Sequence, residues 1–382
     1  MASTVLKATI VRLLCTWATV AAFLLSGEAV LGQLGQPLPS ILIFGWLLGI
    51  IIWAAFGVVH EADILAARLG EPFGTLILTL SIVIIEVALI SAVMLGAKGA
   101  PTLGRDTMFA VLMIVLNGVV GIGLLVGGLR HFAQSYNLNG ASSYLAIIIP
   151  LTVIPLVLPN FTTSTGLGTL TSMQAISFSV FTLALYGVFL VLQTGRHRSF
   201  FQQPTGDQAP VVRTAARQEL NVERHLDHHD PGGRTRVRVV LLLANILPIV
   251  ILAKSLATVL DFGIVQLGAP VALGGILIAM VVFTPECIAA LRAINANQLQ
   301  RAINLCLGAA ASTLGLTVPA VLAIGLFTGQ EVVLGLSNAN MVVLAMTLLL
   351  SSITFTGTRT TMLEGAVHLS VFFVFLVLVF SP

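Results

Sequence analysis

Long apolar segments recur along the whole chain and are separated by short polar links. A membrane span needs about 20 predominantly apolar residues, and eleven segments meet that criterion. They lie near 9–32, 38–59, 73–97, 107–128, 143–159, 172–193, 237–259, 269–295, 301–327, 332–352 and 363–381. A chain inside a bilayer must satisfy its backbone hydrogen bonds internally, which predicts α-helices for these segments. We therefore expect an all-α, polytopic membrane protein with about eleven transmembrane helices.

The composition agrees with this pattern. Of 382 residues, 57% are hydrophobic and only 9% are charged, and the mean hydropathy is +1.04. These values exclude an ordinary water-soluble domain. The first span also has features of a signal peptide, since Lys7 and Arg12 precede its apolar core. Its core is long for a signal peptide and further spans follow at once, which favours a retained helix.

The basic residues lie mostly on one side of the expected membrane. With a cytoplasmic N-terminus, the inner links carry most of the Lys and Arg, whereas only Lys98, Arg105 and Lys254 fall outside. The inner set comprises Lys7, Arg12, Arg68, Arg130, the Arg cluster within 196–238, Arg292, Arg301 and Arg359. This asymmetry follows the positive-inside rule and explains the net charge of +3 by topology rather than by nucleic-acid binding.

A single long polar stretch divides the chain into two halves of five spans each. Five crossings place the start of the second half on the opposite side of the membrane, which predicts inverted repeats. The expected units are an N-terminal peripheral helix at 1–35, a first repeat at 36–193, a cytoplasmic linker at 194–236 and a second repeat at 237–382. The linker contains His225, His228 and His229 beside Asp227 and Asp230, either a metal-sensing cluster or part of a solvated linker.

Two apolar spans carry one central carboxylate each. Glu86 lies within the third span, and Glu286 follows Thr284 and Pro285 in the eighth. A charged group at the centre of a spanning helix costs roughly 2.5 to 3.5 kcal/mol even on lenient scales, and such residues usually mark functional sites. Both acids occupy the second span of their half, so inverted repeats would bring them together near the midplane.

Paired buried carboxylates become neutral by taking up protons or by holding a cation. Ca²⁺ takes six to eight oxygen ligands, of which two carboxylates supply at most about four. We expect neutral oxygens to complete the site, and the candidates are Asn117, Ser312, Thr313, Thr79, Ser81 and Thr284. Aligning Arg105 with Arg301 places Asn117 opposite Thr313. Pro285 lacks an N–H, which favours a broken helix or hinge beside Glu286.

The remaining polar residues have simpler interpretations. Six acids near span ends are expected to be mostly solvated, with Glu71 also a candidate entry ligand. The six are Glu61, Asp63 and Glu71 on the inner side and Asp106, Asp261 and Glu331 on the outer side. His368, beside Glu364, is interpreted as a packing residue, with proton relay as the alternative. Cys15, Cys287 and Cys306 show no metal-binding spacing.

Four long motifs resemble the cation/proton exchangers of the sodium/calcium exchanger superfamily, and most closely the bacterial ChaA-type calcium/proton antiporters. They are GEPFGTLILTLSIVIIEVALISAVML at 70–95, RDTMFAVLMIVLNGVVGIGLLVGGLRH at 105–131, FTPECIAALRA at 283–293 and NQLQRAINLCLGAAASTLGLTVPAVL at 297–322, with GAVHL at 365–369 added. The resemblance implies two inverted five-helix repeats, with Glu86 and Glu286 binding Ca²⁺ or H⁺ in turn. The proline that commonly precedes the first acid is replaced here by Ile85.

The sequence therefore predicts an antiporter of the bacterial inner membrane that exports Ca²⁺, with Na⁺ or K⁺ as alternatives, in exchange for H⁺. It is not expected to be an enzyme or to need a cofactor, and its partners are lipid and the transported ions. Homo-oligomerisation stays an open alternative. A passive cation channel is the main alternative function, and a structural scaffold is a further one. An intramembrane hydrolase is disfavoured because H-E-x-x-H and G-x-S-x-G motifs are absent.

Overall fold

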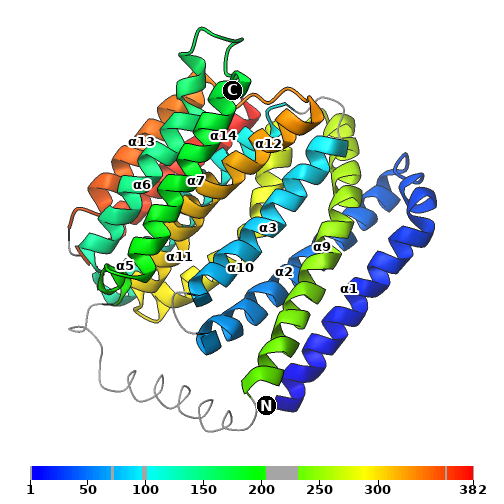
Figure 1. The fold of residues 1–382 in the computed structure, drawn as a ribbon, viewed down its shortest axis with the longest axis horizontal. Coiled ribbons are helices and arrows are strands. Elements are labelled where there is room, and N and C mark those ends of the chain that lie inside the picture. Colours follow the sequence, from blue (N-terminus) through cyan, green and yellow to red (C-terminus); the bar gives the residue numbers. More distant parts are fainter. Residues whose placement is uncertain (1, 70–72, 97–100, 204–230, 358, 382) are drawn as a thin grey trace.

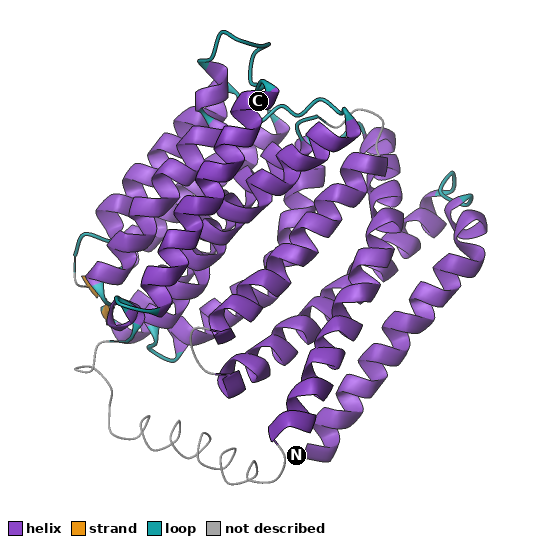
Figure 2. Ribbon diagram, viewed as in Figure 1, coloured by secondary structure: helices purple, strands orange, loops and turns teal. Residues whose placement is uncertain are grey.

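The computed structural model describes residues 2–69, 73–96, 101–203, 231–357 and 359–381. Within these ranges the chain is almost entirely helical, and the helices run roughly side by side (Figures 1 and 2). The long helices before the polar linker are α1 (Ala2–Leu31), α2 (Pro37–Leu69), α3 (Phe73–Gly96), α4 (Leu103–Leu112), α5 (Val120–His131), α6 (Leu138–Leu156) and α7 (Ser172–Thr194). Those after it are α9 (Pro231–Leu267), α10 (Ala272–Asn295), α11 (Leu299–Ser312), α12 (Val318–Thr328), α13 (Asn338–Thr354) and α14 (Met362–Phe380).

Nine helical segments in the described ranges are long and apolar enough to cross a membrane, and two shorter apolar helices lie at Leu80–Met94 and Asn338–Thr354. Together they match the eleven expected spans, so the predicted fold class is confirmed. The tenth span begins later than expected, at Asn338, because residues 330–337 are not helical. The N–H groups of residues 333–336 donate to the carbonyls of Pro101, Gly168 and Leu156.

The two halves show the same order of elements. In each half the third span is interrupted by a π-helical turn, η1 (Met113–Val119) between α4 and α5, and η4 (Thr313–Thr317) between α11 and α12. The first helices of the halves, α2 and α9, pack on each other and run in opposite directions (Figure 1). Helix α1 packs against both of them at one side of the molecule.

Prolines and short elements shape the ends of several spans. Pro150 and Pro155 lie inside α6, which is followed by a 3₁₀ turn, η2 (Leu158–Asn160). A second 3₁₀ turn, η3 (Arg198–Phe201), follows α7. Side-chain caps begin α7 and α14, where Thr171 and Thr361 form capping boxes with Gln174 and Glu364.

A small antiparallel strand pair connects the two halves of the chain. Strand β1 (Gln134–Ser135) follows α5 and pairs with β2 (Arg359–Thr360), which precedes α14. The Tyr136 hydroxyl donates to the carbonyl of Gly357 beside this pair. Burial, with a smaller effect from the negative charge of Glu364, raises the pKa of Tyr136 to about 12. The phenol therefore remains a hydrogen-bond donor at physiological pH.

A glycine seam brings α5 and α14 into close contact. A Cβ atom added at Gly365 would lie 2.5 Å from the backbone N of Leu125 and 2.8 Å from the carbonyl O of Gly121. A Cβ at Gly128 would lie 2.6 Å from the backbone N of Met362. The two backbones approach this closely only because the side chains are absent. The seam sets the position of the rest of α14, including His368 one turn further along.

We expect Gly365→Ala to destabilise the protein because the new methyl group would meet backbone atoms that cannot move independently. Overpacking of this kind typically costs about 1 to 3 kcal/mol. The melting temperature of the purified protein in detergent measures the effect. Gly187→Ala is the matched control, since a Cβ there would contact nothing within 4 Å and alanine favours a helix. Equal melting temperatures for the two variants would contradict the close-contact interpretation.

Candidate functional site

The Glu86 carboxylate is buried in the middle of the bundle. It lies on α3 with 0% of its surface exposed, and its Oε2 accepts a hydrogen bond of 2.9 Å from the hydroxyl of Thr313. Thr313 begins the π turn η4 in the other half of the chain. The hydroxyl of Thr317, at the end of the same turn, lies close to Glu86 but has no partner at hydrogen-bonding geometry. Two hydroxyls of η4 thus flank one buried carboxylate.

Glu286 lies on α10, close enough to Glu86 for their charges to interact. Its Oε2 is buried and has no hydrogen-bond partner among the described residues. The charge of Asp63, an exposed residue near the end of α2, also acts on it. Three carboxylates from α2, α3 and α10 therefore form an acidic series that leads from an exposed position to a fully buried one. Such a series repels itself unless protons or cations neutralise it.

The two π turns lie at corresponding positions of the halves. Helix α3 of the first half packs against η4, and α10 of the second half packs against η1. Each acid-bearing helix thus contacts the π turn of the opposite half. Single π turns inside α-helices are frequent at functional sites, because they shift side chains and carbonyls out of the regular register. The predicted correspondence of Asn117 with Thr313 agrees with this placement, since one lies in each turn.

Asn117 is fully buried but does not face its carboxylate as Thr313 does. Its amide nitrogen donates to the Thr347 hydroxyl at 2.8 Å, and its Oδ1 lies 3.1 Å from Nδ1 of His368. The other ring nitrogen of His368 lies 3.0 Å from the hydroxyl of Thr354. In the described residues no hydrogen bond joins Asn117 to Glu286. The two halves of the site are therefore arranged differently.

Two of the other candidate ligands form hydrogen bonds within their own helices. Ser312 is buried and donates to the carbonyl of Ala309, and Thr284 donates to the carbonyl of Met280. Ser81 is buried on α3, five residues before Glu86. The side chain of Thr79, also on α3, and the whole of Glu71 lie outside the described residues.

The expected break at Pro285 is wrong. Helix α10 continues as an α-helix from Ala272 to Asn295 with Pro285 inside it. Proline removes only its own N–H, and a helix packed on several sides holds its path despite one missing hydrogen bond. The irregular turns occur instead in η1 and η4. A hinge role for Pro285 stays a prediction.

Two acids expected to be solvated are buried and paired. Glu61 is 0% exposed, and its Oε2 lies 2.8 Å from the Arg238 guanidinium. Asp106 is 8% exposed and lies 2.8 Å from the Nε of Arg105. Both lie near span ends, where their sequence positions predicted solvent exposure, but an arginine side chain forms an ion pair with each of them. Asp63 and Glu331 are exposed as expected.

Several residues around the paired acids were not predicted from the sequence. Thr317 lies four positions after Thr313. Like Thr313, it is a polar residue within an apolar span, and this sequence signal could have identified it. Thr347 is also a lone polar residue in a span. The interaction of Asp63 with Glu286 had no sequence signal, because it depends on how the end of α2 lies against α10.

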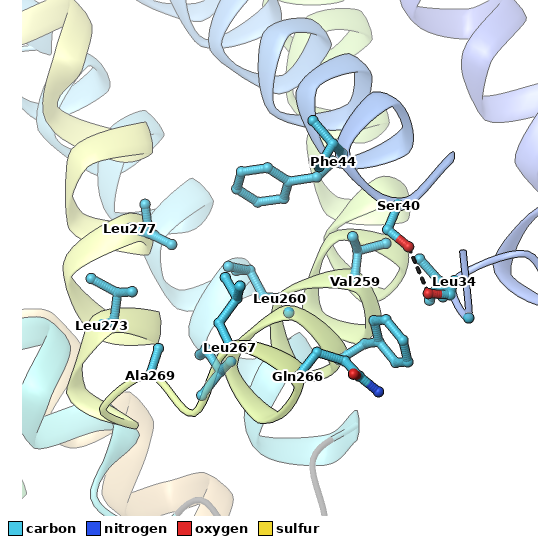
Figure 3. Close-up of a pocket in the computed structure, with 15 residues that line it drawn as sticks. Leu34, Ser40, Phe44, Val259, Leu260, Gln266, Leu267, Ala269, Leu273 and Leu277 are labelled. Carbon is cyan, nitrogen blue, oxygen red and sulfur yellow. Dashed lines mark hydrogen bonds between the residues drawn. The ribbon is translucent and has the colours of Figure 1, made fainter. Parts of the chain in front are cut away.

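An apolar recess among the described residues is separate from these carboxylates. It has a volume of about 430 Å³ and is formed where the start of α2, the end of α9 and the start of α10 meet (Figure 3). Leucine and phenylalanine side chains dominate its lining, with Ser40 and Gln266 at the edge and no charged group. An apolar recess without charge offers nothing to a cation. This recess is therefore not a candidate for the cation site.

The donor set around Glu86 and Glu286 suits hard ions. In the part of the chain that the structure describes, no group of three or more His, Cys, Asp or Glu residues is arranged to hold a metal. Two carboxylates and the Thr313 and Thr317 hydroxyls supply only oxygen, the ligand type that Na⁺-like and Ca²⁺-like ions prefer over soft metals.

Comparison with known proteins identifies the family. The family model described as sodium/calcium exchanger protein matches residues 39–195 and 237–381, one segment in each half. The chain belongs to the sodium/calcium exchanger family. A family of exchangers moves ions across membranes, so this chain is a multi-pass membrane transporter of the same kind.

Two relatives and one solved structure illustrate the relationship. The chain is 40% identical over 347 residues to the "Putative ionic transporter y4hA" of Sinorhizobium fredii, covering 91% of this chain and 90% of the relative. It is 38% identical over 352 residues to the "Sodium-potassium/proton antiporter ChaA" of Escherichia coli, covering 91% of each. The structure of native YfkE matches with a TM-score of 0.71 at 16% identity, over 97% of this chain and 100% of that one. The last comparison supports the exchanger fold, and the first two support membership of the family.

Proposed function

We propose that this exchanger is a cation/proton antiporter of the bacterial inner membrane in which Glu86 and Glu286 bind a cation or protons in turn. The buried pair of carboxylates carries this proposal. Two like charges that interact in a low-dielectric interior must be neutralised, and two protons or one divalent cation do so equally. Competition for the same oxygens couples the two fluxes, provided that the site opens to one side at a time.

Ca²⁺ is the first cation that we propose, because its charge matches the two carboxylates. Thr313 and Thr317 would add neutral oxygens, and water would complete the six to eight ligands. A monovalent exchange is the second candidate. It is favoured by the similarity to ChaA, whose printed name is sodium-potassium/proton antiporter. Two Na⁺ or K⁺ ions would neutralise the same pair.

The test is uptake of ⁴⁵Ca²⁺ or ²²Na⁺ into liposomes that contain the purified protein and have an acidic interior. We expect uptake driven by the pH difference, and an apparent KM for the cation that rises as the external pH falls. The sign follows from competition, since each proton bound to a carboxylate removes a charge that would hold the cation. Collapsing the gradient with a protonophore is the control. Uptake that persists unchanged without a gradient or counter-ion would indicate a channel and overturn the proposal.

A further inference from the structure

The asymmetry between the two π turns points to residues outside the paired acids. Thr313 of η4 donates to Glu86 across the halves. Asn117, its counterpart in η1, instead has both ends of its amide engaged by α13 and α14, the last two helices of the chain. Glu286 on the facing helix keeps a buried oxygen without a partner. The neutral oxygen that would complete the second half of the site is thus occupied elsewhere.

The hydrogen-bond directions around His368 are fixed by its neighbours. The Oδ1 of Asn117 can only accept, so Nδ1 of His368 must carry the proton and donate. The ring also faces the backbone carbonyl of Leu116, a second acceptor. Nε2 is then the acceptor for the hydroxyl of Thr354. This arrangement leaves one neutral tautomer that satisfies both nitrogens.

Packing holds the imidazole in place. His368 is 0% exposed, and the glycine seam at Gly121 and Gly365 presses α14 onto α5 one turn away. Phe372, one turn further along α14, lies in contact range of Gly118, the residue after Asn117. The ring therefore cannot withdraw from Asn117 without a separation of α14 from the first half of the chain.

We propose that His368 is a positioning residue that, with Thr347, holds the Asn117 amide away from Glu286, and that cation loading exchanges these hydrogen bonds for coordination by Asn117. The inference rests on the proposed exchange and gives a structural reason for the affinity of the site for its cation. Each cation that recruits the Asn117 oxygen must first break the bond to His368. The latch formed by His368, Thr347 and Asn117 weakens cation binding and thereby eases release.

The test measures equilibrium binding of ⁴⁵Ca²⁺ and ²²Na⁺ to the full-length protein in detergent, together with KM and kcat in liposomes. His368→Phe keeps a ring but removes the donor, and we expect the cation Kd and KM to fall about three- to ten-fold, the size expected for one lost hydrogen bond. We expect kcat to change less. His368→Asn restores a donor near the Nδ1 position and should return Kd and KM close to wild type. Ser370→Ala, at an exposed position of the same helix, is the control.

A double-mutant cycle distinguishes positioning from packing. In an Asn117→Ala background the latch has nothing to hold, so His368→Phe should leave Kd unchanged there. An equal effect in both backgrounds, a raised Kd, or a Kd that does not respond to His368→Phe in wild type would overturn the inference while leaving the exchange proposal intact. Wild-type protein that binds and transports neither cation would overturn both.

Discussion

Exchange is expected to stop when either Glu86 or Glu286 is replaced by glutamine. Glutamine keeps the size of the side chain and a carbonyl oxygen, but it can neither release a proton nor carry the charge that holds a cation. Because Glu86 is fully buried and its charge acts on Glu286, each substitution removes half of the negative charge of the pair. We expect proton-driven cation uptake in liposomes to fall to the level of protein-free vesicles for both variants.

Folding should survive these two substitutions. A neutral amide costs less to bury than a carboxylate, so the melting temperature in detergent should stay equal to wild type or rise. Glu331→Gln is the matched control, because Glu331 is exposed in the structure and should transport normally. Transport retained by Glu86→Gln or Glu286→Gln at more than a small fraction of wild type would remove that acid from the mechanism.

A large loss of stability is expected from Glu61→Gln. Glu61 is fully buried, its Oε2 lies 2.8 Å from Arg238, and its charge also acts on Arg12. Arg12 is 8% exposed and holds Asn245 of α9 through its Nε. Removing the carboxylate would leave two guanidinium groups near each other with no counter-charge. Breaking a fully buried ion pair from one side typically costs about 3 to 5 kcal/mol. Because the Arg238 side chain is 30% exposed, solvent screens part of its charge, and we expect a loss toward the lower end of that range.

The measurement is the melting temperature and the detergent half-life of the purified variant. The double variant Glu61→Gln with Arg238→Gln should recover at least half of the loss, because one of the unpaired charges is then removed as well. If Glu61→Gln alone melts with wild type, the pair contributes nothing and the buried cluster is held together by packing.

The spans were predictable from the sequence because length and hydropathy decide them and few alternatives exist in a bilayer. Glu86 and Glu286 were equally visible, since each is a lone charge in an apolar run. The partners of Glu61 were not visible, because Arg238 lies 177 positions away and only the packing of α2 on α9 brings them together. Position near a span end therefore gave the wrong environment for this acid.

The π turns show a different limit. The sequences MIVLNGV and TLGLT have no composition that marks an extra residue per turn, whereas Pro285 carries a strong local signal and yet leaves α10 continuous. Aligning the halves placed Asn117 opposite Thr313, and the structure has each of them within a π turn. The alignment did not reveal that one faces Glu86 and the other His368, because those contacts depend on α13 and α14.

The bond between Thr313 and Glu86 has a consequence for biosynthesis. The two residues are 227 positions apart, and ribosomes add about 5 to 20 residues per second. Glu86 is thus synthesised roughly 10 to 45 s before Thr313, whose hydroxyl donates a hydrogen bond to its carboxylate. During that interval the first half of the protein lies in the membrane while Glu86 lacks its hydrogen-bond donor. The hydrogen bond forms only when the second half has been inserted and has packed against the first.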